Sequence, residues 1–413
     1  MRPLRIALLS RSYWLENHLE PDGEGGPTQQ LAEAVAALGH EVVVMTHSFQ
    51  ARKPQKSNIG PLETWFYPRE KHRNALMFLR DRWARKAYSH PQIYTDALAL
   101  RDFLALRGPF DVLWAPSESP DGLVVAVAAQ LGVKLPPVLL QVEGLRVYFE
   151  KGAPVFIDKR PLGLAFRHAA RILACSELVA KVLPAYAGRG LTVENLNAKV
   201  HVVYPNIQRA FLQAARQNPS VPAPMPDRVL FLGELSQHKG AFLFLKAVPK
   251  TQASKRNSTF TVIGDFAQYK KLLIRRWEEA QEEARVQILG ARMEYLDHVS
   301  VSEVIRQIKL ARVVVIPALF DAFSRGVVEA LVLGRPVITT DKVGAAALVR
   351  AHDCGIVIPA NDSAALAHAI DVVLSPIVPF VAKAQHAGQQ LFHDFSPEAV
   401  ALRIAHHLSE IAR

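Results

Sequence analysis

Cysteine is scarce in this chain: only two of its 413 residues, Cys175 and Cys354, carry a thiol. They lie far apart, each in an apolar stretch, so we expect two buried, unpaired thiols. So small a number leaves no disulfide framework of the kind that stabilises small secreted domains, and no cysteine-rich zinc site.

Long apolar runs are also absent. No uninterrupted run approaches the ~20 residues with which a helix crosses a bilayer. The run at residues 6–9 is too short for a signal peptide, and no small-residue cleavage site follows it. We therefore expect a cytoplasmic protein. With 50% hydrophobic and 21% charged residues, the chain has the composition of an ordinary globular protein of two or three domains.

Acidic residues are in deficit: 38 Asp and Glu face 49 Lys and Arg, a net charge of +11. Such a charge indicates an anionic partner, namely nucleic acid, a membrane surface or a phosphate-bearing ligand. No recognised nucleic-acid-binding module is apparent, so nucleic acid is not expected. The excess is concentrated at residues 51–107, where 12 basic and 5 acidic side chains leave a local net charge of +7.

Residues 75–88, within this basic stretch, mix apolar and cationic side chains. As a helix they would lie on an anionic membrane, so that residues 69–88 make a peripheral contact with its inner face near a lipid-linked acceptor. Alternatively, Leu76, Leu79 and Trp83 would pack the helix onto the first domain, with its charges in solvent. The sequence leaves both interpretations open.

The remaining pattern alternates aliphatic runs with helix-forming segments. Residues 5–10 predict a buried strand, Pro27 suits the first position of a helix over 28–38, and residues 41–46 predict a second strand. Close succession of strand, helix and strand implies parallel pairing with a right-handed crossover. Further strands are expected at residues 111–115, 138–142, 171–176 and 200–203, with a helix at 122–131.

A second alternation follows a proline-rich stretch. Four prolines between residues 219 and 226 predict that the segment after residue 206 is a linker without regular structure. Beyond it the sequence predicts strands at 229–233, 260–264, 286–289, 313–316 and 337–340, helices at 241–249 and 269–284, and a helix at 381–413 that is interrupted near 395–397. Two successive doubly wound α/β domains fit this pattern.

The segment 321–329 carries the strongest chemical signal. Asp321 follows the strand at 313–316, Ser324 is a good N-cap for the next helix, and ligands of open α/β sheets bind at such strand ends. The amides at the helix start form a ready anion site. Glu329 lies one turn in on an apolar face, where its carboxylate needs a partner such as ribose hydroxyls. The plainer alternative is that Glu329 faces solvent and Asp321 only ends a strand.

Asp321, Phe323, Ser324 and Glu329 resemble the acidic-x7-acidic signature of family-4 glycosyltransferases. The likeness covers nearly the whole chain through residues 6–10 with 25–26, 174–177, 203–206, 232–235 with 239–240, 334–338, and 355–357 with 362. It implies a GT-B fold, in which two Rossmann-like doubly wound domains face each other across a cleft. Residues 1–206, completed by the helix at 381–413, would form the acceptor-side domain, and 207–380 the nucleotide-sugar donor domain.

The resemblance implies transfer of a hexose from a nucleotide sugar to an acceptor that the sequence does not identify, whether glycan, lipid-linked or small molecule. Family analogy implies retention at the anomeric carbon, no metal, and no cofactor besides the co-substrate. In the family the first acid contacts donor sugar hydroxyls and the second contacts the ribose, which assigns these roles to Asp321 and Glu329. Backbone around Phe323, Ser324 and Arg325 would hold the sugar and phosphates.

Donor contacts are also implied at Gly25, Gly26, Gly233, Glu234, Lys239 and Arg292. Lys239 would neutralise the leaving diphosphate, because a fixed cation stabilises charge that develops on the departing oxygen. The paired glycines before a helix start would let backbone approach the diphosphate or the acceptor. Arg292, in a loop expected at the same sheet edge, would face the nucleotide base.

Four positions depart from the family pattern. Glu234 stands where an Arg is usual, Glu143 where many members have His, Asp321 is shorter than the usual Glu, and Ala347 replaces a common Glu. A carboxylate at 234 would repel the diphosphate. We hypothesise that a nearby arginine, at 325 or 292, restores the positive charge.

Two classes of function therefore remain. In the first, the chain is a glycosyltransferase whose catalytic residues are Glu143, Lys239 and Asp321. In the second, it is a non-catalytic or altered-donor homologue that binds a sugar nucleotide or a protein partner. A sugar-nucleotide epimerase would share the architecture, but the acidic-x7-acidic context argues against it.

Overall fold

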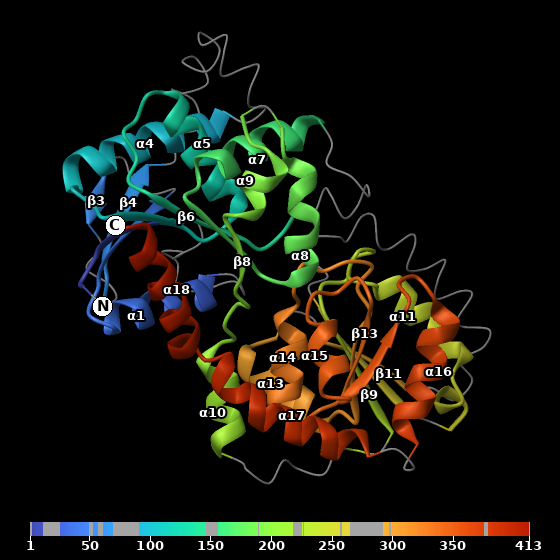
Figure 1. The fold of residues 1–413 in the computed structure, drawn as a ribbon. Coiled ribbons are helices and arrows are strands. Elements are labelled where there is room, and N and C mark those ends of the chain that lie inside the picture. Colours follow the sequence, from blue (N-terminus) through green and yellow to red (C-terminus); the bar gives the residue numbers. More distant parts are fainter. Residues whose placement is uncertain are drawn as a thin grey trace. The chain divides into compact units, whose positions relative to one another are not determined.

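The computed structural model describes residues 2–10, 25–48, 53–56, 61–68, 91–145, 156–188, 190–217, 225, 227–256, 258–264, 292–296, 299–375 and 379–412. The chain forms two compact units, Met1–Asn206 with Pro397–Arg413, and Ile207–Ser396 (Figure 1). Each unit is built on its own largely parallel sheet with helices packed against it, which confirms the predicted α/β class with two doubly wound domains.

The first sheet, in its described part, has the strand order β3-β4-β2-β1-β5-β6-β7-β8. All neighbouring pairs are parallel except β3 with β4. The strands are β1 Arg5–Leu9, β2 Glu41–Ser48, β3 Gln55–Lys56, β4 Glu63–Pro68, β5 Val112–Ala115, β6 Val138–Val142, β7 Arg171–Ala174 and β8 Val200–Val202. Central strands such as β1, β5 and β7 are largely apolar because a parallel sheet is buried on both faces.

Helices of the first unit cover this sheet. They are α1 Gly25–Ala37, α4 Pro91–Arg107, α5 Leu123–Gln130, α7 Phe156–His168, α8 Glu177–Val182, α9 Val193–Asn197 and α18 Pro397–Ile411, with short turns at Glu118–Gly122 and Leu183–Tyr186. The C-terminal α18 lies beside α1 (Figure 1) and buries Val400, Ile404 and Leu408 in the same core as β1 and β5. The end of the chain therefore completes the first unit.

The second sheet, as described, has the order β11-β10-β9-β12-β13-β14, and every pair is parallel. Its strands are β9 Arg228–Leu232, β10 Thr259–Ile263, β11 Arg292–Leu296, β12 Val313–Ile316, β13 Val337–Thr340 and β14 Gly355–Ile358. Its helices are α10 Arg209–Gln217, α11 Ala241–Ala247, α13 Val301–Leu310, α14 Arg325–Val332, α15 Ala346–Ala351, α16 Ser363–Leu374 and α17 Phe380–Asp394, with turns at Val248–Lys250 and Ala253–Arg256.

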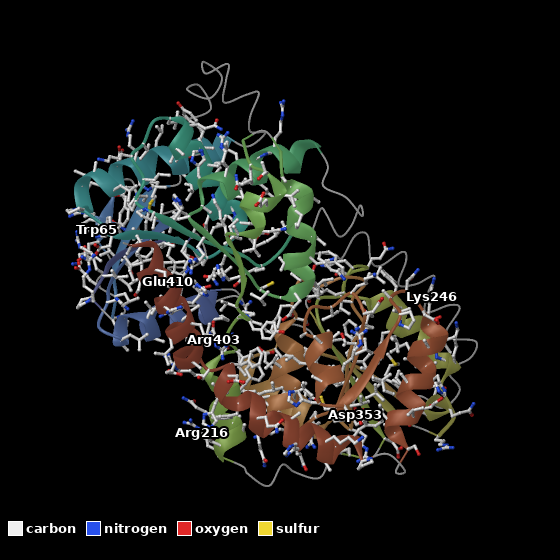
Figure 2. All side chains as sticks on the ribbon, viewed as in Figure 1. Trp65, Arg216, Lys246, Asp353, Arg403 and Glu410 are labelled. Carbon is white, nitrogen blue, oxygen red and sulfur yellow. The ribbon has the colours of Figure 1, made fainter. Side chains whose placement is uncertain are left out.

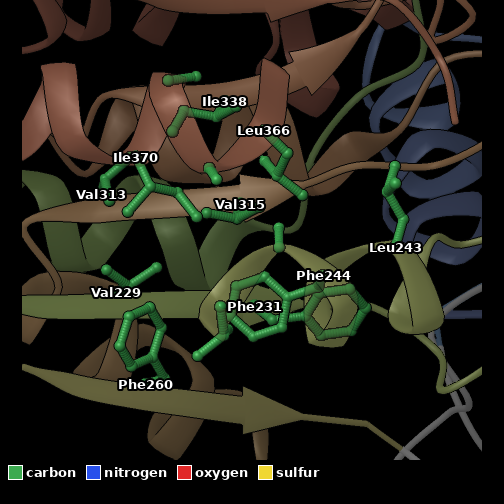
Figure 3. Close-up of a cluster of buried hydrophobic side chains, with 14 of the residues drawn as sticks. Val229, Phe231, Leu243, Phe244, Phe260, Val313, Val315, Ile338, Leu366 and Ile370 are labelled. Atoms are coloured by element: carbon green, nitrogen blue, oxygen red, sulfur yellow. The ribbon is translucent and has the colours of Figure 1, made fainter. Parts of the chain in front are cut away.

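An aromatic and aliphatic core supports this sheet (Figure 3). The Phe244 ring from α11 lies 5.3 Å from that of Phe231 and 6.2 Å from that of Phe260, centroid to centroid. Leu366 and Ile370 of α16 pack over the central strands in the same cluster. Burial of this face holds α11, and hence the turn before it, in a defined place against β9.

Two boundaries differ from the sequence prediction. The stretch after residue 206 is not wholly a linker, because residues 209–217 form α10 and bury Phe211 and Leu212. All four prolines lie beyond this helix, which is why it forms. Residues 381–394, expected to complete the first domain, instead form most of α17 in the second unit, where α17 packs on α14.

Some predicted features lie outside the described residues: the loop at 11–24, the basic segment 69–88, the helix at 269–284 and the strand at 286–289. Among the helices that are described, none combines the length and apolar character needed to cross a membrane. Both cysteines are buried and free, as predicted, and burial raises the pKa of the Cys354 thiol to about 11.

A cluster of charged groups attaches α18 to the first sheet. Nη1 of Arg171 on β7 lies 2.8 Å from Nδ1 of His407, and Arg171 also pairs with Glu410, which is labelled in Figure 2. The rings of His201 and His407 are 4.9 Å apart. Burial, reinforced by the positive charge of neighbouring groups, lowers the pKa of His407 to about 4.

We expect this histidine to make stability depend on pH. A pKa lower in the folded than in the unfolded state means that unfolding takes up protons, so stability falls as pH drops below ~6.5 towards 4. The linkage relation gives a loss of about 2 kcal/mol between pH 7 and pH 5. Urea unfolding at both values should show this loss reduced in His407→Gln and retained in the exposed neighbour variant His406→Gln. An unchanged loss in His407→Gln would contradict the assignment.

Candidate functional site

The strand order of the second sheet reverses between β9 and β12. Strand β9 has β10 on one side and β12 on the other. The connections that leave β9 and β12 therefore run to opposite sides of this strand pair. In doubly wound sheets such a switch point opens a crevice at the carboxyl ends of the two strands, where ligands bind. The ends of β9 and β12, Leu232 and Ile316, therefore mark the candidate site.

The turn after β9 is shaped by glycine. Gly240, the N-cap of α11, has φ +80°, and a Cβ there would lie 2.0 Å from the backbone oxygen of Pro317. The Leu319 amide donates to the carbonyl of His238 at 2.7 Å. The turn that carries Lys239 is thus held against the loop after β12 by close backbone contact.

Lys239 and Asp321 form an ion pair at this switch point, although 82 residues separate them. Nζ of Lys239 lies 2.7 Å from Oδ2 of Asp321, and the two side chains are 30% and 15% exposed. Oδ1 of Asp321 accepts from the Phe323 amide at 3.3 Å. The sequence prediction named both residues, and the fold brings them together.

The backbone of Asp321 is fixed by the loop after β13, which sequence reasoning missed. Its amide donates to the carbonyl of Lys342, and its own carbonyl accepts from Gly344, both at 3.0 Å. The only sequence signal for this loop is its position directly after a buried strand. Asp321 is therefore anchored from two neighbouring strands.

Helix α14 begins beside this ion pair. Ser324 is its N-cap, as predicted, but the expected side-chain cap is wrong: with φ +72° the hydroxyl makes no capping hydrogen bond. At Gly326 a Cβ would lie 3.3 Å from Ile316 Cδ1 and 3.4 Å from Leu232 Cδ2, so the helix start packs directly over the ends of β12 and β9. Its first amides are thereby placed at the switch point.

Glu329 lies one turn into α14 and is partly buried. Burial raises the pKa of its carboxyl to about 7, and the charge of Arg325 acts in the opposite direction. Arg325 thus lies close enough to act on the carboxylate from the same helix start. Phe323 is buried and its ring stacks on Phe395 at 5.9 Å, so this residue presents backbone rather than its side chain.

The backbone of Arg292 lies at the other edge of the second sheet. It is the first residue of β11 and pairs with Thr259, the first residue of the parallel strand β10. The start of a parallel strand lies at the opposite sheet edge from the carboxyl ends of β9 and β12. The expected donor-loop position of Arg292 is therefore wrong, because this residue begins a strand instead of lying in a loop after one.

Two further departures from the family pattern, Glu234 and Ala347, lie in the second unit. The carboxylate of Glu234 is 3.7 Å from Nε2 of His238, four residues on in the same turn, so the acid has a neighbour that is cationic when protonated. Ala347 lies exposed on α15. Gly233 precedes Glu234 with φ +151°.

The carboxyl edge of the first sheet carries a second set of predicted residues. Gly26 is buried in the first turn of α1, which begins at Gly25, and Asn206 donates to the carbonyl of Pro27 at 3.1 Å. Glu143 follows β6 directly and is partly buried. Its amide donates to the buried Glu118, a residue that sequence reasoning missed. The one available signal was its place in the loop after the strand predicted at 111–115.

Neither edge resembles a metal centre in the part of the chain that is described: no three His, Cys, Asp or Glu side chains there are arranged to hold an ion. The second-sheet edge instead combines one lysine, two carboxylates and a helix start. Such a set suits a ligand that has both an anionic group and hydroxyls.

Two protein families match the chain. Residues 24–194 match the family described as glycosyl transferase 4-like domain, and residues 226–375 match glycosyl transferases group 1. Together the matches span both units, and the second includes the turn after β9, the β12 loop and α14.

Individual proteins show the same likeness. The chain is 24% identical over 239 residues to glycogen synthase of Mycobacterium tuberculosis, a match that covers 58% of this chain and 54% of that one. The chain thus spans about half the length of the curated relatives it matches. Among solved structures, sucrose-phosphate synthase from Thermosynechococcus elongatus superposes with a TM-score of 0.72 at 18% identity over 99% of each chain. Anabaena Alr3699/HepE, solved with UDP-glucose, gives 0.66 at 16% identity over 98% of this chain and 100% of that one.

Proposed function

The chain belongs to the group 1 glycosyltransferases and has their GT-B fold, and we propose that it transfers a hexosyl group from a nucleotide sugar to an acceptor, with retention and without a metal. The single observation that carries the proposal is the Lys239–Asp321 pair at the switch point, beside the start of α14. A cation and the amides of a helix start suit a diphosphate, and a fixed carboxylate suits sugar hydroxyls.

Lys239 has the central role in this scheme. When the bond between the anomeric carbon and the phosphate oxygen breaks, positive charge develops on the sugar and negative charge on the departing diphosphate. Lys239 and the amides at the start of α14 stabilise the negative charge because both are fixed at the switch point before the bond breaks. Asp321 holds the ammonium group through one oxygen and presents its carboxylate to the sugar hydroxyls.

Glu329 binds the ribose hydroxyls, and its raised pKa makes donor affinity depend on pH. The carboxyl is neutral below pH 7 and ionised above it, and only the carboxylate accepts from both hydroxyls. We expect the donor KM to fall about tenfold between pH 6 and pH 8, in proportion to the ionised fraction. Steady-state kinetics should show this dependence lost in Glu329→Gln and retained in the control Glu303→Gln on α13. A pH dependence that survives in Glu329→Gln would assign the titration to another group.

A screen of nucleotide sugars tests the proposed function. Each donor is incubated with the protein and a mixture of glycan, lipid and small-molecule acceptors, and released nucleoside diphosphate and glycosylated product are measured. One donor should give both, and NMR of the product should show the anomeric configuration of the donor. Failure of every donor to release nucleotide would overturn the proposal.

A non-catalytic homologue is the second candidate, favoured by one observation. Glu234 places a carboxylate in the turn that carries Lys239, where it opposes an anionic ligand. Arg325 at the start of α14 is the cation we propose to offset it. Calorimetric binding of a nucleotide sugar without its turnover would select this second function.

The acceptor-side proposal rests on the basic segment. Residues 69–88 lie outside the described residues, but their composition supports a peripheral contact of a cytoplasmic enzyme with an anionic membrane surface. Co-sedimentation with vesicles that contain anionic lipid should be salt-sensitive, and sedimentation independent of lipid charge would reject the contact.

A further inference from the structure

A buried carboxylate holds the loop that carries Glu143. Glu118 follows β5, the strand next to β6, and is 6% exposed. Its Oε2 accepts from the amide of Glu143 at 3.0 Å, and its Oε1 accepts from the amide of Leu145 at 2.9 Å. The two oxygens of one side chain thus bind both ends of a three-residue loop.

The loop is closely fitted around this carboxylate. A Cβ on Gly144 would lie 2.6 Å from Oε1 of Glu118, so a larger residue there would push this carboxylate out of place. Leu145 has φ +55°, a conformation that a non-glycine residue keeps only where its surroundings impose it. The two hydrogen bonds supply that constraint.

The turn that carries Glu118 is itself packed on β6. The Gly122 amide donates to the Ser117 carbonyl at 2.9 Å, and a Cβ at Gly122 would lie 2.9 Å from Cδ1 of Leu140. Leu140 is buried within β6, the strand that ends at the Glu143 loop. The packing of this turn on β6 therefore fixes the position of Glu118 relative to the loop.

The chemistry of the contact requires a carboxylate. Both partners are N–H donors, and an ionised carboxyl is acceptor-only at both oxygens. Burial and the charge of Glu143 raise the pKa of Glu118, while the two backbone amides favour its ionised form. A glutamine of the same size would set an NH₂ donor against one of the amides.

We propose that Glu118 is a positioning residue for glycosyl transfer, which acts by fixing the Glu143–Leu145 loop so that the Glu143 carboxylate has one place at the carboxyl edge of the first sheet. This inference rests on the proposed function and on a part for Glu143 in the reaction. Glu118 itself contacts backbone and not substrate.

A double-mutant cycle tests the inference. Glu118→Gln should lower kcat about 10- to 100-fold, the cost of a misplaced reacting group, with the donor KM changed less than about twofold. Combined with Glu143→Gln, it should lower kcat no further than Glu143→Gln alone, because both changes remove the same contribution. A merely structural role would give the same fractional loss in both backgrounds, and that result, or a normal kcat in Glu118→Gln, would overturn the inference.

A second variant guards against misfolding of the first. Gly144→Ala keeps Glu118 but sets a methyl group against its carboxylate, which displaces the same loop. This variant should lower kcat with little change in the donor KM, as Glu118→Gln does, and should have no further effect in the Glu143→Gln background. A normal kcat in this variant would also count against the inference. If the unsubstituted protein turns over no nucleotide sugar, the proposed function fails. If the unsubstituted protein is active and the effects of Glu118→Gln and Glu143→Gln on kcat are independent, the proposed function stands and only the positioning role of Glu118 fails.

Discussion

Replacing Lys239 with methionine is expected to lower kcat by about 10²- to 10³-fold, the usual cost of removing one preorganised group that stabilises developing negative charge. Methionine keeps most of the side-chain length and removes the ammonium group 2.7 Å from Asp321. The leaving diphosphate then keeps the helix amides but loses its fixed cation. The donor KM should rise less than kcat falls, because the charge being stabilised grows as the bond breaks. Initial rates of nucleotide release measure both constants.

Lys250→Met is the matched control for this change. Lys250 lies in the turn beyond α11, in the same unit, and hydrogen-bonds to Ser363 at 2.7 Å. Lys250→Met changes the net charge by the same amount as Lys239→Met, but at a position away from the switch point. Its kcat should therefore stay within about twofold of that of the unsubstituted protein. Equal rates for Lys239→Met and Lys250→Met would remove Lys239 from the mechanism.

Gly240→Ala is expected to have the largest effect on stability. The residue has φ +80°, and its Cβ would lie 2.0 Å from the backbone oxygen of Pro317, which cannot rotate away. A left-handed conformation and an overpacked contact together cost roughly 2 to 5 kcal/mol. The turn must also move, which displaces Lys239 from Asp321, so turnover should fall with stability. Calorimetric unfolding and donor kinetics measure the two effects.

Gly132→Ala isolates the steric part of this cost. Gly132 has nearly the same dihedral, φ +78°, but no atom lies within 4 Å of the position of its Cβ. This variant should therefore lose only about 1 kcal/mol, the cost of the backbone conformation alone, and keep its activity. If the two variants were equally stable, the proximity of Pro317 would have no energetic role.

The sequence predicts the core strands of both sheets well, for a physical reason. Strands such as β6, β12 and β13 are buried at every residue and are therefore mostly aliphatic, with Gln141 and the two threonines of β13 as exceptions. Helices α4 and α13 were not predicted. Apolar residues lie all around α4, so no single face stands out, whereas α13 has Val301, Val304, Ile305 and Ile308 at helical spacing and could have been recognised. Helix α10 was not predicted, because the prolines that follow it indicated a linker for the whole stretch after residue 206.

The site was only partly predictable. The acidic pattern of residues 321–329 identified Asp321 and Glu329, but their relation to Lys239 depends on the sheet order that sets β9 beside β12, which a linear sequence does not contain. Arg292 was misplaced because it begins β11, whereas the sequence prediction put it in a loop three residues beyond a strand end. Glu118 was missed because a buried acid that binds backbone amides has no partner side chain to form a motif.

The central claim is that the switch point of the second sheet holds the diphosphate of a nucleotide-sugar donor. Calorimetric titration with UDP, GDP and ADP tests it most directly, in the unsubstituted protein and in the Lys239→Met and Lys250→Met variants. The account predicts that one of these nucleotides binds, that its affinity falls at least tenfold in Lys239→Met, and that it is unchanged in Lys250→Met. Binding that is equally strong in Lys239→Met, or no binding of any of the three, would contradict the account.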